Sequence, residues 1–311
     1  MPVIRINAKG DIPVLHGGHR SLAPTLTHAL TQNGPVVVMI HGYSFLPYDR
    51  IHCPHRHIFS GADHLANPKA LSWPKNLGFG TGSPDEGLAI AFGWHARGTL
   101  WAARETSRSA ARALARVIEM VRDQAPEKPV HIVAHSLGAH LALTTLTFLQ
   151  AHDVSRILVL NGATHQSHAH QALATKAGKT CELFNIVSQE NAVYDFLFES
   201  CVPASSRMDR SLGRGFTAAN ALTTRLDHIP VLEALNHQGY PIARPKHWYC
   251  HWSTYLRPGV FPFYQALLRR PERLPLHHLR RLFDEAENAP SVSRRGLGRF
   301  NLLPIFAKQA S

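Results

Sequence analysis

The chain has 311 residues, of which 44% are hydrophobic and 17% charged, a composition ordinary for a globular protein with a sizeable core. Its formal net charge of +12 and pI near 10.0 favour anionic partners in general. No basic run is interleaved with aromatic residues, so we expect solvated arginines and no nucleic-acid partner. The four cysteines lack CxxC spacing, which argues for reduced thiols and against a zinc ribbon, and we expect no metal site.

The first ten residues lack the apolar core of a signal peptide, and no stretch reaches the length of a transmembrane helix. We therefore expect a cytoplasmic protein. A basic tail leaves contact with an anionic membrane surface open as an alternative.

The first half of the chain predicts strands separated by loops and one long helix. Residues 3–7 and 12–15 read as short opening strands, and the apolar runs at 35–40 and 88–92 as buried parallel strands. Residues 46–84 read as loops with one short strand near 70–73. A helix is predicted over 99–122, with arginines every four residues on one face. We interpret this face, which holds Arg104, Arg108, Arg112 and Arg116, as solvated rather than as an anion site.

Residues 129–140 organise the chain. A β-branched strand is followed by one serine between small residues, Ala134 and Gly138, and then by helix formers. A strand, a sharp turn with Ser136 at its apex and a helix form a nucleophile elbow. The pattern indicates hydrolase-type serine chemistry.

The second half continues the alternation of strands and helices. Strands are predicted at 156–160 and 183–187, a His-rich helix or loop at 166–177, a lid-like excursion at 197–246, and helices at 260–270 and around 276–283. The fold class is α/β, with a mostly parallel central sheet flanked by helices. We expect one domain over 1–270 and a basic tail over 271–311, loosely attached at its end.

A serine hydroxyl needs a base, and the base needs a group that fixes its tautomer. His251 is the preferred base, because it follows a strand-like segment and precedes a helix. Competing histidines are His247, His228 and His237.

The acid is expected after the strand at 183–187. Glu190 is the carboxylate nearest to the strand end and is the first choice, with Asp195 as the alternative acid. The backbone N–H groups of Tyr43, after the His41-Gly42 pair, and of Leu137 are predicted to form the oxyanion hole.

These segments resemble the α/β-hydrolase superfamily, in its chain order of nucleophile, acid and histidine, over roughly residues 35–270. The resemblance implies an esterase-like or lipase-like fold and activity, with a covalent acyl-enzyme and no cofactor. Two positions depart from the pattern. Ala134 replaces the first glycine of the elbow, and Asn191 stands where relatives often have an aspartate, which leaves the acid open between Glu190 and Asp195.

The leading hypothesis is a serine hydrolase that cleaves a small-molecule carboxylic ester or thioester. An acyltransferase on the same scaffold and a non-catalytic binding protein of this fold are the alternatives. Phe45, Trp94 and Trp252 are candidates for lining an acyl pocket. The soft ligands at 52–57 are interpreted as a packed loop rather than a metal site.

Overall fold

A computed structural model describes residues 2–18, 21–62 and 71–288. The strands are β1 (Val3–Lys9), β2 (Ile12–Leu15), β3 (Val36–Ile40), β4 (Leu88–Gly93), β5 (Val130–His135), β6 (Arg156–Leu160), β7 (Glu182–Val187) and β8 (Ala221–Arg225). The α-helices are α1 (Leu22–Ala29), α2 (Trp73–Asn76), α3 (Leu100–Gln124), α4 (Gly138–Thr145), α5 (Gln166–Leu173), α6 (Lys176–Thr180), α7 (Ala192–Cys201), α8 (Ile229–His237), α9 (Ser253–Leu256), α10 (Val260–Arg269) and α11 (Leu276–Asn288).

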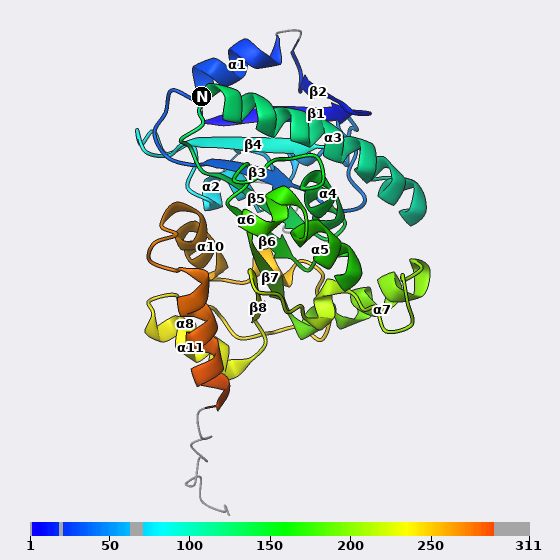
Figure 1. The fold of residues 1–311 in the computed structure, drawn as a ribbon, viewed down its shortest axis with the longest axis vertical. Coiled ribbons are helices and arrows are strands. Elements are labelled where there is room, and N and C mark those ends of the chain that lie inside the picture. Colours follow the sequence, from blue (N-terminus) through cyan, green and yellow to red (C-terminus); the bar gives the residue numbers. More distant parts are fainter. Residues whose placement is uncertain (1, 19–20, 63–70, 289–311) are drawn as a thin grey trace, which may run out of the picture.

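The strands form one eight-stranded sheet in the order β2-β1-β4-β3-β5-β6-β7-β8 (Figure 1). The β1–β2 hairpin is antiparallel, and all other pairs are parallel. The predicted fold class, a mostly parallel sheet flanked by helices, is confirmed. The carboxyl ends of the parallel strands meet at one edge, where ligands bind in such sheets.

Helices cover both faces of the sheet, and this explains the continuous apolar runs of the central strands. Alternate residues of β3 join different cores, because successive side chains of a strand point to opposite faces. Val36 and Val38 pack with α1, α3, α4, α5 and α6. Val37 and Met39 pack in the second core with α2, α8, α9, α10 and α11.

Two parts of the predicted lid-like excursion belong to the body of the protein. Residues 221–225 form β8, which pairs with β7 as an edge strand, and α8 contributes Leu232 and Leu235 to the second core. The Thr-rich sequence of β8 lacks the apolar run of an inner strand. Residues 197–216 remain as the part of the excursion near the proposed site.

The short strand expected near 70–73 is not observed in its described part. Ser72 instead caps helix α2, its hydroxyl accepting from the Lys75 amide at 3.4 Å, and residue 70 lies outside the described residues. The tail helix α11 packs against α8 and β8 and buries Leu279 and Phe283. The tail end predicted to be loosely attached, 289–311, also lies outside the described residues. Within the described ranges, the helices are too short or too polar to cross a membrane.

Candidate active site

Ser136 occupies a strained turn between β5 and α4. Its φ of +54° is in the left-handed region, which a non-glycine residue adopts at a cost. Close packing keeps the turn free of side chains on two sides. A Cβ on Gly138 would lie 2.6 Å from the His41 carbonyl oxygen, and one on Gly42 would lie 2.7 Å from the Ser136 Cβ. This geometry is that of a nucleophile elbow.

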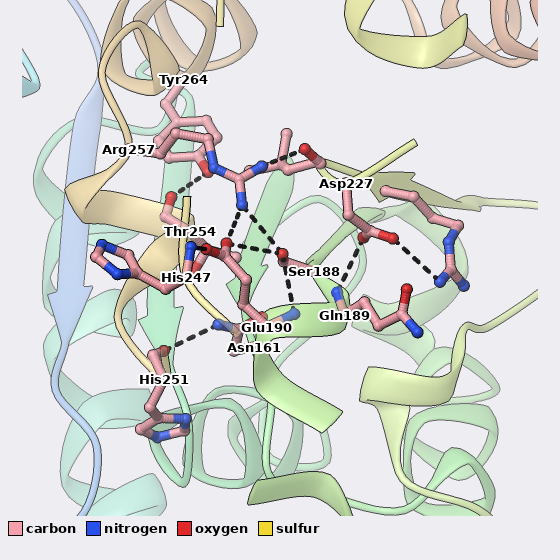
Figure 2. Close-up of polar contacts among 12 residues, drawn as sticks. Asn161, Ser188, Gln189, Glu190, Asp227, His247, His251, Thr254, Arg257 and Tyr264 are labelled. Carbon is pink, nitrogen blue, oxygen red and sulfur yellow. Dashed lines mark hydrogen bonds and ion pairs between the residues drawn. The ribbon is translucent and has the colours of Figure 1, made fainter. Parts of the chain in front are cut away.

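The structure brings His251 onto the serine from a segment 115 residues away. Its Nε2 lies 2.8 Å from the Ser136 Oγ. The imidazole stacks on Tyr194 at a centroid distance of 4.5 Å and contacts His135 at 4.6 Å. Its backbone carbonyl accepts hydrogen bonds from Asn161 Nδ2 at 2.9 Å (Figure 2) and from His135 Nε2 at 3.1 Å. Both the backbone and the ring of His251 are therefore fixed beside the nucleophile.

The other ring nitrogen of His251 contacts an amide, not a carboxylate. Nδ1 lies 2.6 Å from the Oδ1 of Asn191, the residue that precedes α7. Asp195, one turn further along, accepts hydrogen bonds from the Asn191 side chain and from the Ser211 hydroxyl at 2.9 Å. Because an ionised carboxylate only accepts, Asp195 binds the amide NH₂ and turns the amide oxygen toward His251. The proton is then on Nδ1, and Nε2 is the free base facing Ser136.

Burial shifts the pKa values of His251 and Asp195 in opposite directions. It lowers the pKa of His251 well below 6.5, and the neighbouring His135 lowers it further. Burial also raises the pKa of Asp195 to about 6, against the opposing hydrogen bonds from Ser211 and Asn191. The imidazole is therefore neutral at neutral pH, whereas Asp195 titrates close to that range.

Glu190, the first choice for the acid, does not contact the His251 ring. Its carboxylate forms a buried ion pair with Arg257 and accepts the backbone N–H of His247 at 3.0 Å (Figure 2). Burial alone would raise the pKa of Glu190, but the His247 amide and the Arg257 guanidinium hold it below its ordinary value. Arg257 also donates to the Ser188 hydroxyl at 3.1 Å and to the carbonyl of Leu226, the residue after β8.

The position of Glu190 has a physical reason. The Glu190 carboxylate lies on the side of the loop that meets a buried cation, and a buried cation left without a carboxylate is costly. The Glu190 carbonyl oxygen also accepts the Cys250 amide at 2.7 Å. Glu190 therefore ties the end of β7 to the segment that carries His251. Asp195, the alternative acid, reaches His251 only through Asn191.

The competing histidines have other positions. His247 contributes its backbone amide to Glu190, His228 precedes α8 with its ring 3.7 Å from Glu287, and His237 ends α8. Among the residues that the structure describes, His251 is the histidine in hydrogen-bond contact with Ser136.

The two amides predicted for an oxyanion hole border the same cavity as Ser136. Within the described part of the chain, the N–H groups of Tyr43 and Leu137 donate to no protein acceptor. His41 supports the turn before Tyr43: its Nδ1–H donates to the Gly42 carbonyl at 2.9 Å, and its Nε2 accepts from the Trp94 amide at 3.0 Å. Burial lowers the pKa of His41 to about 3, so the ring stays neutral.

A cavity of about 590 Å³ opens in front of Ser136. Of the aromatic residues expected to line an acyl pocket, Phe45 and Trp252 do so. Trp94 is instead buried behind the turn, stacked on His41 at 5.6 Å. Leu197 and other apolar side chains complete a largely apolar wall: Ile51, Leu100, Ala163 and Phe198. The size and lining of this cavity suit an apolar ligand group.

The His-rich loop at 52–57 closes one side of this cavity. His52 and His57 line it, while the His55 Nε2 lies 2.7 Å from the Asn7 Oδ1 and the His52 Nδ1 lies 3.1 Å from the Asp49 carboxylate. In residues 2–18, 21–62 and 71–288, no group of three or more His, Cys, Asp and Glu side chains is arranged to hold a metal ion.

A mostly parallel sheet covered on both faces, with a serine on a strained strand-to-helix turn, is the architecture of the α/β-hydrolase fold. The sequence agrees with this class. Residues 20–162 match a family model described as "Alpha/beta hydrolase of unknown function (DUF900)". The match includes the turn at 41–43 and the elbow, but ends before Asn191 and His251. A search of curated proteins finds no match to this chain.

Asn191 is the site residue that sequence reasoning did not select. The signal was present, because Asn191 stands at the loop position where relatives often carry an aspartate. Carboxylates are the usual partners of a catalytic histidine, and Asn191 has one on each side, at positions 190 and 195. An amide oxygen can fix the imidazole tautomer as a carboxylate does, but it supplies no charge.

Proposed function

We propose that the chain is a serine hydrolase that cleaves a carboxylic ester or thioester through a covalent acyl-enzyme on Ser136. The observation that carries this proposal is the 2.8 Å contact between the Ser136 Oγ and the His251 Nε2 at the floor of an apolar cavity. A hydroxyl beside a neutral, oriented imidazole is the nucleophile of acyl transfer.

The proposed reaction proceeds in two halves. Ser136 attacks the acyl carbon as its proton passes to the His251 Nε2, and the Tyr43 and Leu137 amides stabilise the oxyanion that forms. The imidazolium then protonates the departing alkoxide or thiolate. Water attacks the acyl-enzyme with the same imidazole as base, which releases the carboxylic acid and restores Ser136.

Asn191 and Asp195 act on the ring rather than on the substrate. Asn191 holds Nδ1–H so that the lone pair on Nε2 faces Ser136, and Asp195 fixes which way the Asn191 amide points. The His251 imidazolium is therefore stabilised by the dipole of the Asn191 amide in contact with it and by the Asp195 carboxylate behind that amide. We regard both as positioning residues.

Turnover of a panel of p-nitrophenyl esters and acyl thioesters tests the proposal. The wild-type protein is expected to hydrolyse short-chain members, and Ser136→Ala and His251→Ala are each expected to lower kcat by about 10⁴-fold or more. Turnover that persists in folded Ser136→Ala would contradict the proposal. Absence of turnover across the panel, with no acylation of Ser136, would favour the non-catalytic binding protein.

A further inference from the structure

A second cavity, of about 400 Å³, lies among α3, α4, α5 and the segment at 203–209. These helices cover one face of the sheet (Figure 1). Three of the four arginines of the α3 row, Arg104, Arg108 and Arg112, line it together with the imidazoles of His140, His165 and His168. The row interpreted from sequence as a solvated face thus also borders a cavity, which is open to solvent on the side of Arg108 and Arg112.

The arginines of the cavity carry more positive charge than the surrounding residues neutralise. Arg108 pairs with Glu105 at 2.9 Å on the solvent side, and Arg112 lies over the Phe148 ring at 5.4 Å. Arg104 is half-buried and, among the described residues, forms no ion pair. Burial and the neighbouring Arg108 lower the pKa of Arg104, and the exposed Glu105 opposes them. Arg104 thus lies beside a like charge, and none of the described carboxylates is in contact with it.

Among the described residues, Asp209 is the carboxylate that lines the cavity, and its oxygens are already hydrogen-bonded. Its oxygens accept from the Ser167 hydroxyl at 2.6 Å, the Ser167 amide at 3.0 Å and the Ser205 hydroxyl at 2.8 Å. Among the described residues, three arginines stand against Asp209 in the lining and Glu105 on the solvent side of Arg108, which leaves an excess of one positive charge. That excess favours an anion.

Buried imidazole nitrogens supply the second observation. The Nε2 atoms of His140 and His165 are buried and, within the described part of the chain, have no hydrogen-bond partner. The His140 side chain is 2% exposed, and its Nδ1 is held by the Thr164 hydroxyl at 3.2 Å. A buried polar nitrogen without a partner is costly, and such groups occur where a ligand completes the hydrogen bonding.

We infer that this cavity binds a phosphate group, either as free phosphate or as part of a small phosphorylated molecule. Guanidinium groups donate paired hydrogen bonds to phosphate oxygens, and neutral imidazole N–H groups donate single ones. Arg104 and Arg108 supply the charge at the mouth, and His140 and His165 line the interior. The role proposed for Ser136 is not required by this inference.

The phosphate site adjoins the catalytic cavity. Phe198 lines the catalytic cavity, and its ring contacts that of His165 at 4.9 Å in the wall between the two cavities. Leu100 of the catalytic cavity lies one turn of α3 before Arg104. A ligand that extends beyond its phosphate group toward Phe198 would therefore approach the cavity in front of Ser136.

Isothermal titration of the wild-type protein with inorganic phosphate and with phenyl phosphate, at fixed ionic strength, tests the inference. Saturable 1:1 binding is expected, weakened about tenfold or more in Arg104→Gln and in Arg108→Gln. Arg116→Gln is the matched control, because Arg116 continues the same row outside the cavity and pairs with Asp11 at 2.7 Å. It removes the same charge and is expected to leave the affinity within twofold.

Equal affinity for the two probes would indicate recognition of the free anion, and tighter binding of phenyl phosphate would indicate a larger phosphorylated ligand. Both outcomes support the site. Saturable binding of neither probe would overturn the inference, as would equal weakening in Arg104→Gln and Arg116→Gln, which would indicate a response to net charge alone. Arg108 is half exposed, so Arg108→Gln keeps the test valid if Arg104→Gln fails to fold.

Discussion

Exchanging the amide and the carboxylate beside His251, in the double variant Asn191→Asp/Asp195→Asn, changes the charge next to the ring without changing the number of polar groups. In the wild-type protein the Nδ1 of His251 faces the neutral Asn191 amide at 2.6 Å, and burial holds the pKa of His251 well below 6.5. In the double variant a carboxylate takes the position of that amide, and the amide formed at position 195 can donate to it.

The size of the effect follows from the geometry. An imidazolium and a carboxylate whose charges are centred about 4 Å apart attract by about 4 kcal/mol at an effective dielectric constant of about 20. Part of this is offset by desolvation of the new carboxylate, so we expect the pKa of His251 to rise by about 1–3 units. Each unit corresponds to about 1.4 kcal/mol.

The pH dependence of kcat/KM for a short-chain p-nitrophenyl ester measures this shift, because its acid limb reports the pKa of the base in the free enzyme. The wild-type limb is expected below pH 6.5, and that of the double variant about 1–3 units higher. Asp195→Asn alone is the control, expected to lower kcat/KM without raising the limb. An unchanged acid limb in the folded double variant would refute the placement of Asn191 on His251.

Three further predictions concern the turn, the ion pair and the pocket. Gly42→Ala places a Cβ 2.7 Å from that of Ser136, so the turn must shift. The variant is expected to lower kcat about 10²–10³-fold and to lower Tm by a few degrees, and full activity would contradict the tight packing. Glu190→Gln leaves Arg257 unpaired and is expected to lower the free energy of unfolding at pH 7 by about 3–5 kcal/mol in urea titrations. Because the pKa of Glu190 is lowered on folding, its contribution to stability is present above the unfolded pKa and is lost as pH falls through the folded value. The free energy of unfolding of Glu190→Gln should therefore fall less with acid than that of the wild type. The same pH dependence in both proteins would count against the buried ion pair. Wild-type kcat/KM is expected to rise about fourfold for each acyl methylene from acetyl to butyryl esters. Leu197→Trp fills part of the cavity wall and should abolish that rise. The same dependence on chain length in the variant would place the acyl group elsewhere.

Features fixed by local sequence were predictable. The elbow around Ser136 and the strands of the sheet interior follow from apolar runs and small residues within a few positions of one another. The pairing of Ser136 with His251 was also expected, from the place of this histidine between a strand-like segment and a helix, although the segment before it forms no strand. The β8 edge strand was missed, since Thr223, Thr224 and Arg225 give it no continuous apolar run.

The partner of His251 depended on contacts far apart in the chain. Glu190, Asn191 and Asp195 follow the same strand and lie within six positions of one another, and nothing local separates their roles. Glu190 is taken by Arg257, 67 residues away, and this leaves the Asn191 side chain facing the ring. A buried arginine cannot be distinguished from a surface arginine by its neighbours in sequence.

Covalent labelling with a fluorophosphonate tests the central chemistry most directly. We predict an adduct on Ser136, located by mass spectrometry of the proteolysed protein, that is absent in Ser136→Ala and forms far more slowly in His251→Ala. Folded wild-type protein that stays unlabelled, or that carries the adduct on another residue, would contradict the assignment of Ser136 as the activated nucleophile.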